Sequence, residues 1–310
     1  MMQNNISVEK VWYVTGTSKG LGLVFVKKLL QNGYKVVGTS RDKQHLIDAV
    51  GPIGNSFNFL AVQVELTNEE SIRASFQEAI ERFGRIDVLV NNAGYGICGA
   101  LEENADEDVR KNFDINVFSV FNILRNITPI MREQGSGQIF NISSKVGLIG
   151  LPGISVYCAT KFAVNGLTEA YAAEVKPFGI NVTLVCPGTF RTEILNSEFY
   201  NDYKNKLEHY KPIHNRLEFN DQYLSGNQWG DPEKLADLLI EAYELNLTQK
   251  ETGNYIVVGS EAYPTVRAKQ ERFVKDLDKW EPIGSKTDYE GYDHSTFNQN
   301  LQNFMLNKNK

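Results

Sequence analysis

Short apolar runs alternate with amphipathic stretches along most of the 310 residues, and this alternation constrains the fold more than any other feature. Seven of the runs are typical of strands: VWYVTG, YKVVGTS, NFLAVQV, DVLV, GQIFNIS, NVTLVC and NYIVVG. Stretches with helical apolar spacing separate them. Strands that are apolar on both faces need helices on both sides, and right-handed crossovers then wind the chain in both directions. The sequence therefore predicts a doubly wound, parallel, seven-stranded sheet with helices on both faces.

Such a sheet is a Rossmann-like α/β fold, and no break in composition divides it. We therefore predict one Rossmann-type domain over 1–310, with a core at about 10–260. Residues 189–230 are polar and aromatic, which favours a substrate lid, although a mobile surface insertion is the alternative. Residues 261–310 form a C-terminal extension, expected to be helical at first and frayed in its Asn-rich end.

Charge and composition exclude several classes of partner. The net charge is −6 and no basic block occurs, which disfavours a nucleic acid. No apolar run reaches the length of about 18 residues that a membrane span needs, so we expect no membrane partner. Three scattered cysteines and an N-terminus without a signal peptide predict a cytoplasmic protein without disulfides. The four histidines form no ligand-spaced cluster with acids, so we predict no metal site.

The turn after the first predicted strand, Thr15 to Gly22, is rich in glycine and opens a helix. Free N–H groups and the helix dipole favour an anion there, and glycine lets a pyrophosphate approach the backbone. Glycine-rich turns between strand and helix are common, so the motif alone leaves the ligand open. Its place after the first strand favours a dinucleotide, bound by Gly16, Ser18, Lys19, Gly20, Leu21 and Gly22.

The residue after the second strand indicates which dinucleotide is bound. An acid near this point binds the ribose 2′-hydroxyl of NAD, whereas a basic residue accommodates the 2′-phosphate of NADP. Arg41 stands here, and Lys19 is also placed to meet the phosphate. The alternative is two solvated charges. We predict NADP(H) as the cofactor.

Tyr157 and Lys161 lie four residues apart in SVYCATKFAVNG, so they share one face of a predicted helix. A phenol has an ordinary pKa of about 10, and moving it to about 7 requires ~4 kcal/mol. A cation at ~4 Å, at an effective dielectric constant of about 20, supplies roughly that amount. The pair is either an ordinary surface contact or a proton donor and acceptor that works at neutral pH.

Other polar residues favour the second interpretation. Ser143 and Ser144 close the fifth strand, NNAG (91–94) follows the fourth, and CPGTFRT (186–192) follows the sixth. Asn116 interrupts an apolar helix, where asparagine is a poor helix former, which indicates a kink or a bound water. The segments after strands meet at the carboxyl edge of the sheet, where open α/β sheets bind ligands.

Taken together, these segments resemble the short-chain dehydrogenase/reductase superfamily, in its compact single-domain branch. The matching motifs are TGTSKGLG, NNAG, Asn116, Ser144 thirteen residues before the tyrosine, YCATK and PGTFRT. They cover about residues 10–260. The tail GSEAYPTVRAKQERFVKDLDKWE resembles the hydroxysteroid- and retinol-dehydrogenase-like group.

The resemblance implies a catalytic tetrad. Tyr157 would be the general acid in reduction or the base in oxidation, and Lys161 would lower its pKa and bind the nicotinamide ribose. Ser144 would polarise the carbonyl, and Asn116 would hold a water in a proton relay. The expected function is an NADPH-dependent carbonyl reductase or alcohol dehydrogenase. A catalytically silent NADP(H)-binding sensor is the alternative.

The resemblance also implies the remaining contacts of the site. The further residues expected at the cofactor are Glu65, Leu66, Asn92, Ala93, Gly94, Pro187, Gly188 and Thr192. Glu65 departs from the family, which usually has aspartate there, so the adenine contacts are less firmly implied than the catalytic ones. Expected pocket residues for a mid-sized apolar substrate are Tyr95, Leu148, Ile149 and Phe190. The helices at 106–134 and 155–177 are the usual dimer surface of the family, so we expect a homodimer.

Overall fold

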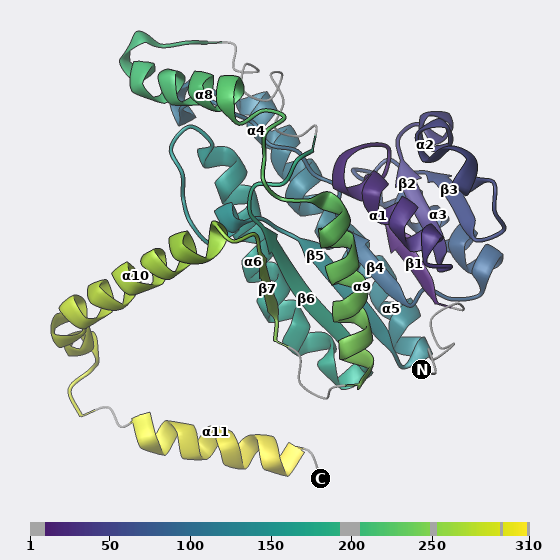
Figure 1. The fold of residues 1–310 in the computed structure, drawn as a ribbon. Helices are drawn as coiled ribbons and strands as arrows, with labels where there is room; N and C mark the ends of the chain where they lie inside the picture. Colours follow the sequence, from purple (N-terminus) through teal and green to yellow (C-terminus); the bar gives the residue numbers. More distant parts are fainter. Residues whose placement is uncertain (1–9, 193–204, 249–252, 292–293, 309–310) are drawn as a thin grey trace. The chain divides into compact units, whose positions relative to one another are not determined.

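A computed structural model describes residues 10–192, 205–248, 253–291 and 294–308 (Figure 1). The chain divides into two compact units, 1–266 and 267–310, which are described separately. The prediction of a single domain stays a prediction. None of the described helices combines the length and apolarity needed to cross a bilayer.

The predicted sheet is confirmed. Its strands within the described residues are all parallel, in the order β3-β2-β1-β4-β5-β6-β7. Their bounds are β1 Val11–Val14, β2 Lys35–Ser40, β3 Phe59–Gln63, β4 Val88–Asn91, β5 Gly137–Ile142, β6 Ile180–Pro187 and β7 Tyr255–Val258. The order reverses between β1 and β4, and this is the point where open parallel sheets bind ligands.

Alternate residues of each strand face opposite layers of the core, as a period of two requires. In β1, Val11 and Tyr13 pack into one apolar cluster, whereas Trp12 and Val14 pack into another. The two clusters lie on opposite faces of the sheet, so β1 is buried on both sides. This explains why its sequence is continuously apolar rather than alternating.

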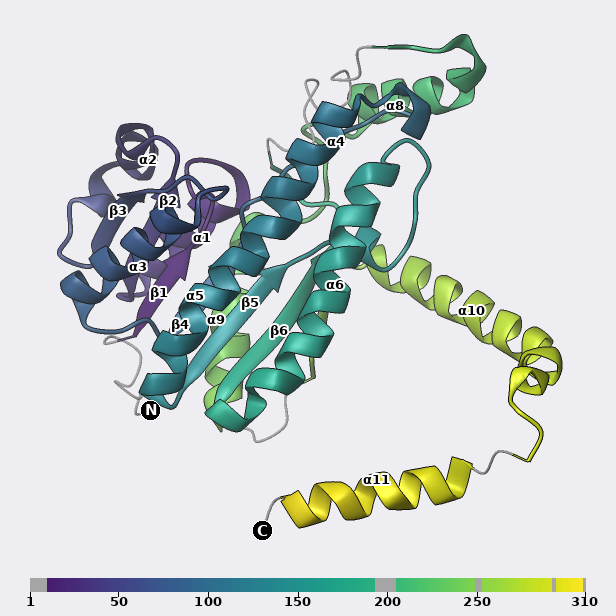
Figure 2. The same ribbon diagram turned by 180° about the vertical axis from the view of Figure 1, so that it is seen from behind.

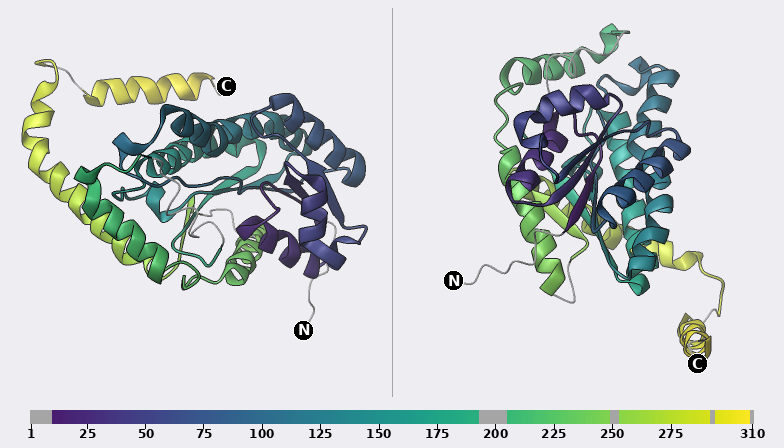
Figure 3. Two further views of the ribbon diagram at one scale, coloured as in Figure 1. Left: turned by 90° about the horizontal axis from the view of Figure 1, so that it is seen from above. Right: turned by 90° about the vertical axis from the view of Figure 1, so that its right-hand side faces the viewer.

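Helices complete both layers of the core. The cluster containing Trp12 is covered by α1, α2 and α9, and the cluster containing Tyr13 by α3, α5 and α6 (Figures 1 and 2). Figure 3 shows the sheet between the two helical layers. The bounds are α1 Gly20–Gln31, α2 Lys43–Val50, α3 Glu69–Phe83, α4 Asp106–Phe113, α5 Ser119–Gln134, α6 Ser155–Val175 and α9 Pro232–Thr248.

The helix expected over 106–134 is helical throughout, although its hydrogen-bonding pattern changes in the middle. A π-helical turn, η3 Asp114–Phe118, separates α4 from α5 and contains Asn116. Insertions of this kind are rare and often mark functional sites. The long helix predicted over 106–134 is therefore confirmed, with a π-helical turn around Asn116, and the kink or bound water expected at Asn116 stays a prediction.

The segment after β6 carries η7 Glu208–Tyr210 and α8 Lys211–Tyr223; residues 193–204 of the predicted lid lie outside the described part of the chain. Shorter 3₁₀ turns elsewhere are η1 Gly51–Gly54, η2 Leu101–Glu103, η4 Lys145–Gly147, η5 Lys176–Phe178 and η8 Ser285–Thr287. At the C-terminus, α10 Ala262–Gly284 confirms the predicted helix. The Asn-rich end, expected to fray, instead forms α11 His294–Lys308.

Candidate active site

The turn between β1 and α1 has the backbone that an anion site requires. Gly16 and Gly20 have positive φ values of 68° and 58°, which residues with a side chain rarely adopt. Lys19, the N-cap residue of α1, makes no capping hydrogen bond, and the first turn carries no acid. The N–H groups of this turn and the positive end of the helix dipole thus remain available to an anion.

Asn92 holds this turn against the end of β4. Its amide donates to the carbonyl oxygens of Thr15 at 2.8 Å and Gly16 at 3.1 Å. The Thr15 hydroxyl accepts in return from the N–H groups of Asn92 and Ala93, both at 3.0 Å. NNAG and the glycine-rich turn are therefore one hydrogen-bonded assembly, and Asn92 positions the turn.

The residues expected around the adenosine half lie at the ends of β2 and β3. Arg41 and Lys19 are exposed, and neither has an ion-pair or hydrogen-bond partner among the residues that the structure describes. Glu65 accepts hydrogen bonds from the backbone and hydroxyl of Thr67. The side chain of Leu66 packs into the core, which leaves only its backbone for contact with a ligand.

Tyr157 and Lys161 lie in the first two turns of α6, as their spacing predicts. The Lys161 ammonium is 5.7 Å from the centre of the Tyr157 ring and donates to the Ile142 carbonyl at 2.9 Å. Ile142 ends β5, and Ser144 two residues later hydrogen-bonds the phenol. The sheet edge and α6 thus bring three members of the predicted tetrad together.

Burial, rather than the Lys161 ammonium, has the largest effect on the pKa of Tyr157, so a lowering of that pKa by Lys161 together with an oxidised nicotinamide stays a prediction. Burial raises the pKa of Tyr157 from 10.0 to about 12, although the hydrogen bond from Ser144 opposes it. Burial also lowers the pKa of Lys161 from 10.5 to about 8, with a smaller opposing effect from the nearby Cys186. Both groups are pushed towards their neutral forms, because a poorly solvated site penalises each charge. At the observed separation the ammonium does not outweigh that penalty.

Asn116 connects the π-helical turn to the site. Its amide nitrogen donates to the Tyr95 carbonyl at 2.8 Å and to the Thr160 hydroxyl at 3.1 Å, and its oxygen accepts from the Tyr95 N–H at 3.0 Å. A Cβ on Gly94 would lie 3.0 Å from Asn116 Oδ1 and 3.6 Å from Lys161 Nζ. Glycine at 94 therefore allows the NNAG segment to lie close to the tetrad.

A cavity of about 280 Å³ lies at the carboxyl ends of β4, β5 and β6 and extends to α8. It brings together part of the predicted site: Leu21, Asn92, Gly94, Ser144, Tyr157, Lys161, Pro187, Gly188, Phe190 and Thr192. Of the four predicted pocket residues, only Phe190 lines it. Tyr95, Leu148 and Ile149 do not, since Ile149 is buried and Leu148 packs against the core.

Comparison with known proteins decides the family. A model of the short chain dehydrogenases matches residues 10–202. The chain belongs to the short-chain dehydrogenase family. The finer likeness of its tail to hydroxysteroid and retinol dehydrogenases stays a prediction.

Two curated relatives extend the family match. The dehydrogenase is 32% identical over 274 residues to Oxidoreductase BOA17 of Botryotinia fuckeliana, covering 88% of this chain and 97% of the other. It is 39% identical over 197 residues to a 3-ketodihydrosphingosine reductase of Bacteroides thetaiotaomicron, covering 64% and 70%.

Solved structures confirm the fold. A short-chain dehydrogenase from Streptomyces avermitilis matches with a TM-score of 0.78 and 33% identity, covering 90% of this chain and 99% of that one. Another from Burkholderia phymatum, in complex with NAD, matches at 0.74 and 26%, covering 86% and 95%. ElxO, with NADP bound, matches at 0.64 and 28%, covering 80% and 96%. Relatives of this dehydrogenase thus hold either nucleotide.

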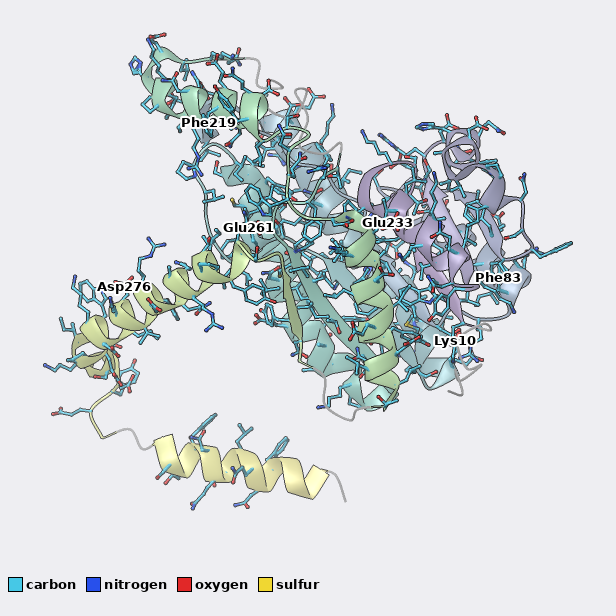
Figure 4. The ribbon with its side chains drawn as sticks, viewed as in Figure 1. Lys10, Phe83, Phe219, Glu233, Glu261 and Asp276 are labelled. Atoms are coloured by element: carbon cyan, nitrogen blue, oxygen red, sulfur yellow. The ribbon has the colours of Figure 1, made fainter. Side chains whose placement is uncertain are left out.

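Sequence reasoning missed a polar cluster at the wall of the dehydrogenase cavity. Lys145 donates to Glu261 at 3.0 Å and to the Thr189 hydroxyl at 3.1 Å, and Glu261 accepts from the Thr189 N–H at 2.7 Å. Glu261 lies between β7 and α10, as labelled in Figure 4, and also accepts from Trp229. No local pattern signals this contact, because 116 residues separate Lys145 from Glu261.

The lid helix is attached to η2 by a buried carboxylate, which was also missed. Glu103 Oε1 lies 2.6 Å from His214 Nε2 and accepts from the Leu207 N–H at 2.8 Å, while Oε2 accepts from the Ala100 N–H at 2.8 Å. Burial acts to raise the pKa of Glu103, but these donors lower it below its ordinary value. The ionised carboxylate thus secures the start of the lid helix.

Proposed function

We propose that this chain is an NADP(H)-dependent oxidoreductase that reduces the carbonyl group of a mid-sized apolar ketone, or oxidises the matching secondary alcohol. One observation carries the proposal: Ser144 and Tyr157 line the same cavity as Lys161, within walls that are largely apolar. A carbonyl oxygen bound between the two hydroxyls would accept a hydrogen bond from each.

The residues at the carboxyl edge fit a dinucleotide. The uncapped start of α1 suits the pyrophosphate, and the unpaired side chains of Arg41 and Lys19 suit a 2′-phosphate. When bound, the nicotinamide supplies or accepts the hydride. Lys161 and the segments after β4 and β6 would hold its ribose and ring.

The pKa values indicate how the protein side chains move the proton. Because burial raises the pKa of Tyr157 to about 12, the phenol is protonated at neutral pH and is ready to donate to the substrate oxygen. The nearby Lys161 ammonium stabilises the phenolate that remains, and Ser144 hydrogen-bonds it. The same groups would accept the proton in the reverse reaction, the oxidation of an alcohol.

The decisive experiment measures NADPH oxidation across ketones, aldehydes, quinones and steroids. We expect Tyr157→Phe to lower kcat at least a hundredfold, since general acid catalysis contributes roughly 10²–10⁴. Tyr289→Phe, at a tyrosine that is 92% exposed, is the matched control and should keep full activity. Wild-type rates in Tyr157→Phe would contradict the catalytic role. A protein that binds NADPH but reduces nothing in the panel would instead be a sensor.

Cofactor choice is tested separately. We expect kcat/KM to favour NADPH over NADH at least tenfold, and Arg41→Asp to abolish that preference, because a carboxylate repels the 2′-phosphate. Arg73→Asp changes the charge equally at an exposed position on α3 and should leave the preference intact. A tenfold preference of the wild type for NADH would contradict the assignment.

We further propose a cytoplasmic homodimer that pairs through α5 and α6. These neighbouring elements expose aromatic rings: Phe118 in η3 is 54% exposed, Phe121 39% and Phe162 43%. Exposed aromatic side chains of this kind often mark an interface. Light scattering should give twice the mass of one chain, and Phe121→Glu should give monomers. A monomeric wild type would contradict the proposal.

A further inference from the structure

The described wall of the cavity is positively charged. It includes three cations, Lys145, Lys161 and Arg216, and no carboxylate among the residues that the structure describes there. The chain as a whole carries 38 acidic and 32 basic residues, with a net charge of −6. The bias of the wall is therefore opposite to that of the protein, which points to a ligand with negative charge.

Two of the three cations already have partners. Lys145 is paired with Glu261 at 3.0 Å, and both side chains are mostly buried. Lys161 donates to the Ile142 carbonyl and lies against Tyr157, where the proposed chemistry uses it. Neither Lys145 nor Lys161 is therefore available to bind the end of a substrate that lies far from the carbonyl group.

Arg216 is different. It lies on α8, lines the cavity, and has no ion-pair or hydrogen-bond partner among residues 10–192, 205–248, 253–291 and 294–308. A guanidinium offers a planar fork of N–H donors that matches a carboxylate in a bidentate manner. The N–H donors of the Arg216 side chain are therefore free to bind an acceptor group of a ligand in the cavity.

The spacing along α8 combines this cation with an apolar surface. Arg216 and Asn220 are one turn apart, so their side chains lie on one face, and both line the cavity. Leu217 of α8 and Leu224, the residue that caps the end of α8, also line it, and Leu217 packs with Cys98 in a small buried cluster. Figure 4 shows α8 with Phe219, which is 59% exposed and does not line the cavity.

Much of the remaining lining of the cavity is apolar. It includes Val146, Leu151, Pro152, Ile154, Leu217 and Trp229. A substrate that reaches from Tyr157 to Arg216 must therefore carry an apolar body between its carbonyl group and its charged end. Pockets of this kind take their affinity from the apolar wall and their orientation from a few polar groups.

We propose that Arg216, assisted by Asn220, binds a carboxylate, and that the preferred substrate is an oxo acid with an apolar chain. This inference rests on the proposed function and names its substrate class. The carbonyl lies at Ser144 and Tyr157, and the carboxylate binds at the lid helix. Arg216 acts as a specificity residue and takes no part in the proton transfer.

Matched substrates test the proposal. Medium-chain oxo acids and their methyl esters differ in the negative charge and in one methyl group, so kcat/KM for each pair compares a carboxylate with a neutral group of similar size. A hydrogen bond to a charged group contributes about 1.5–3 kcal/mol, so we expect the acid to be favoured roughly 10- to 100-fold. Arg216→Gln should remove that preference through a higher KM for the acid, and should show a weaker salt dependence with the acid.

Two control variants sharpen the result. Arg216→Lys keeps the charge but not the fork, and should retain part of the preference. Lys211→Gln removes an exposed cation at the start of α8, outside the cavity wall, and should behave as wild type. Equal kcat/KM for acid and ester in the wild type, or an unchanged preference in Arg216→Gln, would overturn the inference.

A binding measurement separates this inference from the proposed function. Calorimetric titration with decanoate and methyl decanoate should show tighter binding of the carboxylate to the wild type, and equal binding to Arg216→Gln. If simple ketones are reduced and the esters match the acids, only the substrate class is wrong. If decanoate binds through Arg216 but Tyr157→Phe keeps wild-type turnover, the catalytic proposal fails and the carboxylate site stands.

Discussion

We expect the buried ammonium of Lys161 to lower the free energy of unfolding of this protein. Its side chain is 5% exposed, and burial lowers its pKa from 10.5 to about 8. The native state therefore penalises the ammonium, while the unfolded chain leaves it fully hydrated. Replacing Lys161 with methionine removes the charge and keeps a long unbranched side chain. We expect Lys161→Met to be inactive and more stable than the wild type at neutral pH, which is a stability and activity trade-off.

The magnitude follows from the two pKa values. Each pKa unit corresponds to 1.36 kcal/mol, so a lowering from 10.5 to about 8 costs the protonated native state about 3 kcal/mol. Losing the hydrogen bond to Ile142 offsets about 1 kcal/mol of the gain. The variant should therefore exceed the wild type in free energy of unfolding by about 2 kcal/mol at pH 7.

The sign of the pH dependence is fixed by linkage. The penalty is fully present below the folded pKa of about 8, fades as the pH rises through it, and is absent above 10.5. Between about pH 7 and pH 9.5 the wild type should recover about 2 kcal/mol relative to the variant. Taking the difference between the two proteins largely cancels the other titrating groups.

Urea unfolding, followed by circular dichroism at several pH values, measures this difference. Lys234→Met, at an exposed lysine on α9, is the control, and its difference from the wild type should not change with pH. A pH-independent difference between the wild type and Lys161→Met would refute the reasoning. It would mean that the ammonium is hydrated in the native state.

Three further outcomes are expected. Gly22→Ala should weaken nucleotide binding at least tenfold in a fluorescence titration. The added Cβ would lie 2.3 Å from the Gly16 carbonyl oxygen and would displace the turn. Unchanged affinity would contradict the anion site. Glu103→Ala should lower the free energy of unfolding, measured in urea, by about 1–3 kcal/mol, because Leu207 and His214 lose a buried hydrogen-bond partner. Unchanged stability would show that Glu103 does not stabilise the attachment of α8. The pKa of Glu103 is lowered from 4.5, so its stabilising charge is lost only when the pH falls below that value. Hydrogen exchange of the α8 amides in the wild type should therefore increase below about pH 4.5, relative to exchange in Glu103→Ala at the same pH.

The proximity of Tyr157 and Lys161 was predictable because its geometry is local. An i, i+4 spacing on a helix places Tyr157 and Lys161 on one face whatever surrounds them. The π-helical turn at Asn116 was only partly predictable, since a poor helix former signals an interruption without specifying its geometry. Tyr95, Leu148 and Ile149 do not line the cavity, because proximity in sequence to a site does not determine which way a side chain packs, and their contact with a substrate stays a prediction.

The sequence by itself determined the parallel sheet, the glycine turn and the shared helix face of Tyr157 and Lys161, because periodicity and backbone freedom act over a few neighbouring residues. Only the tertiary structure decided that Glu261 neutralises Lys145, that Arg216 lines the cavity without a partner, and that Tyr157 has a raised pKa. Burial and the distances between charges depend on segments far apart in the chain, and these quantities exist only once the layers have packed.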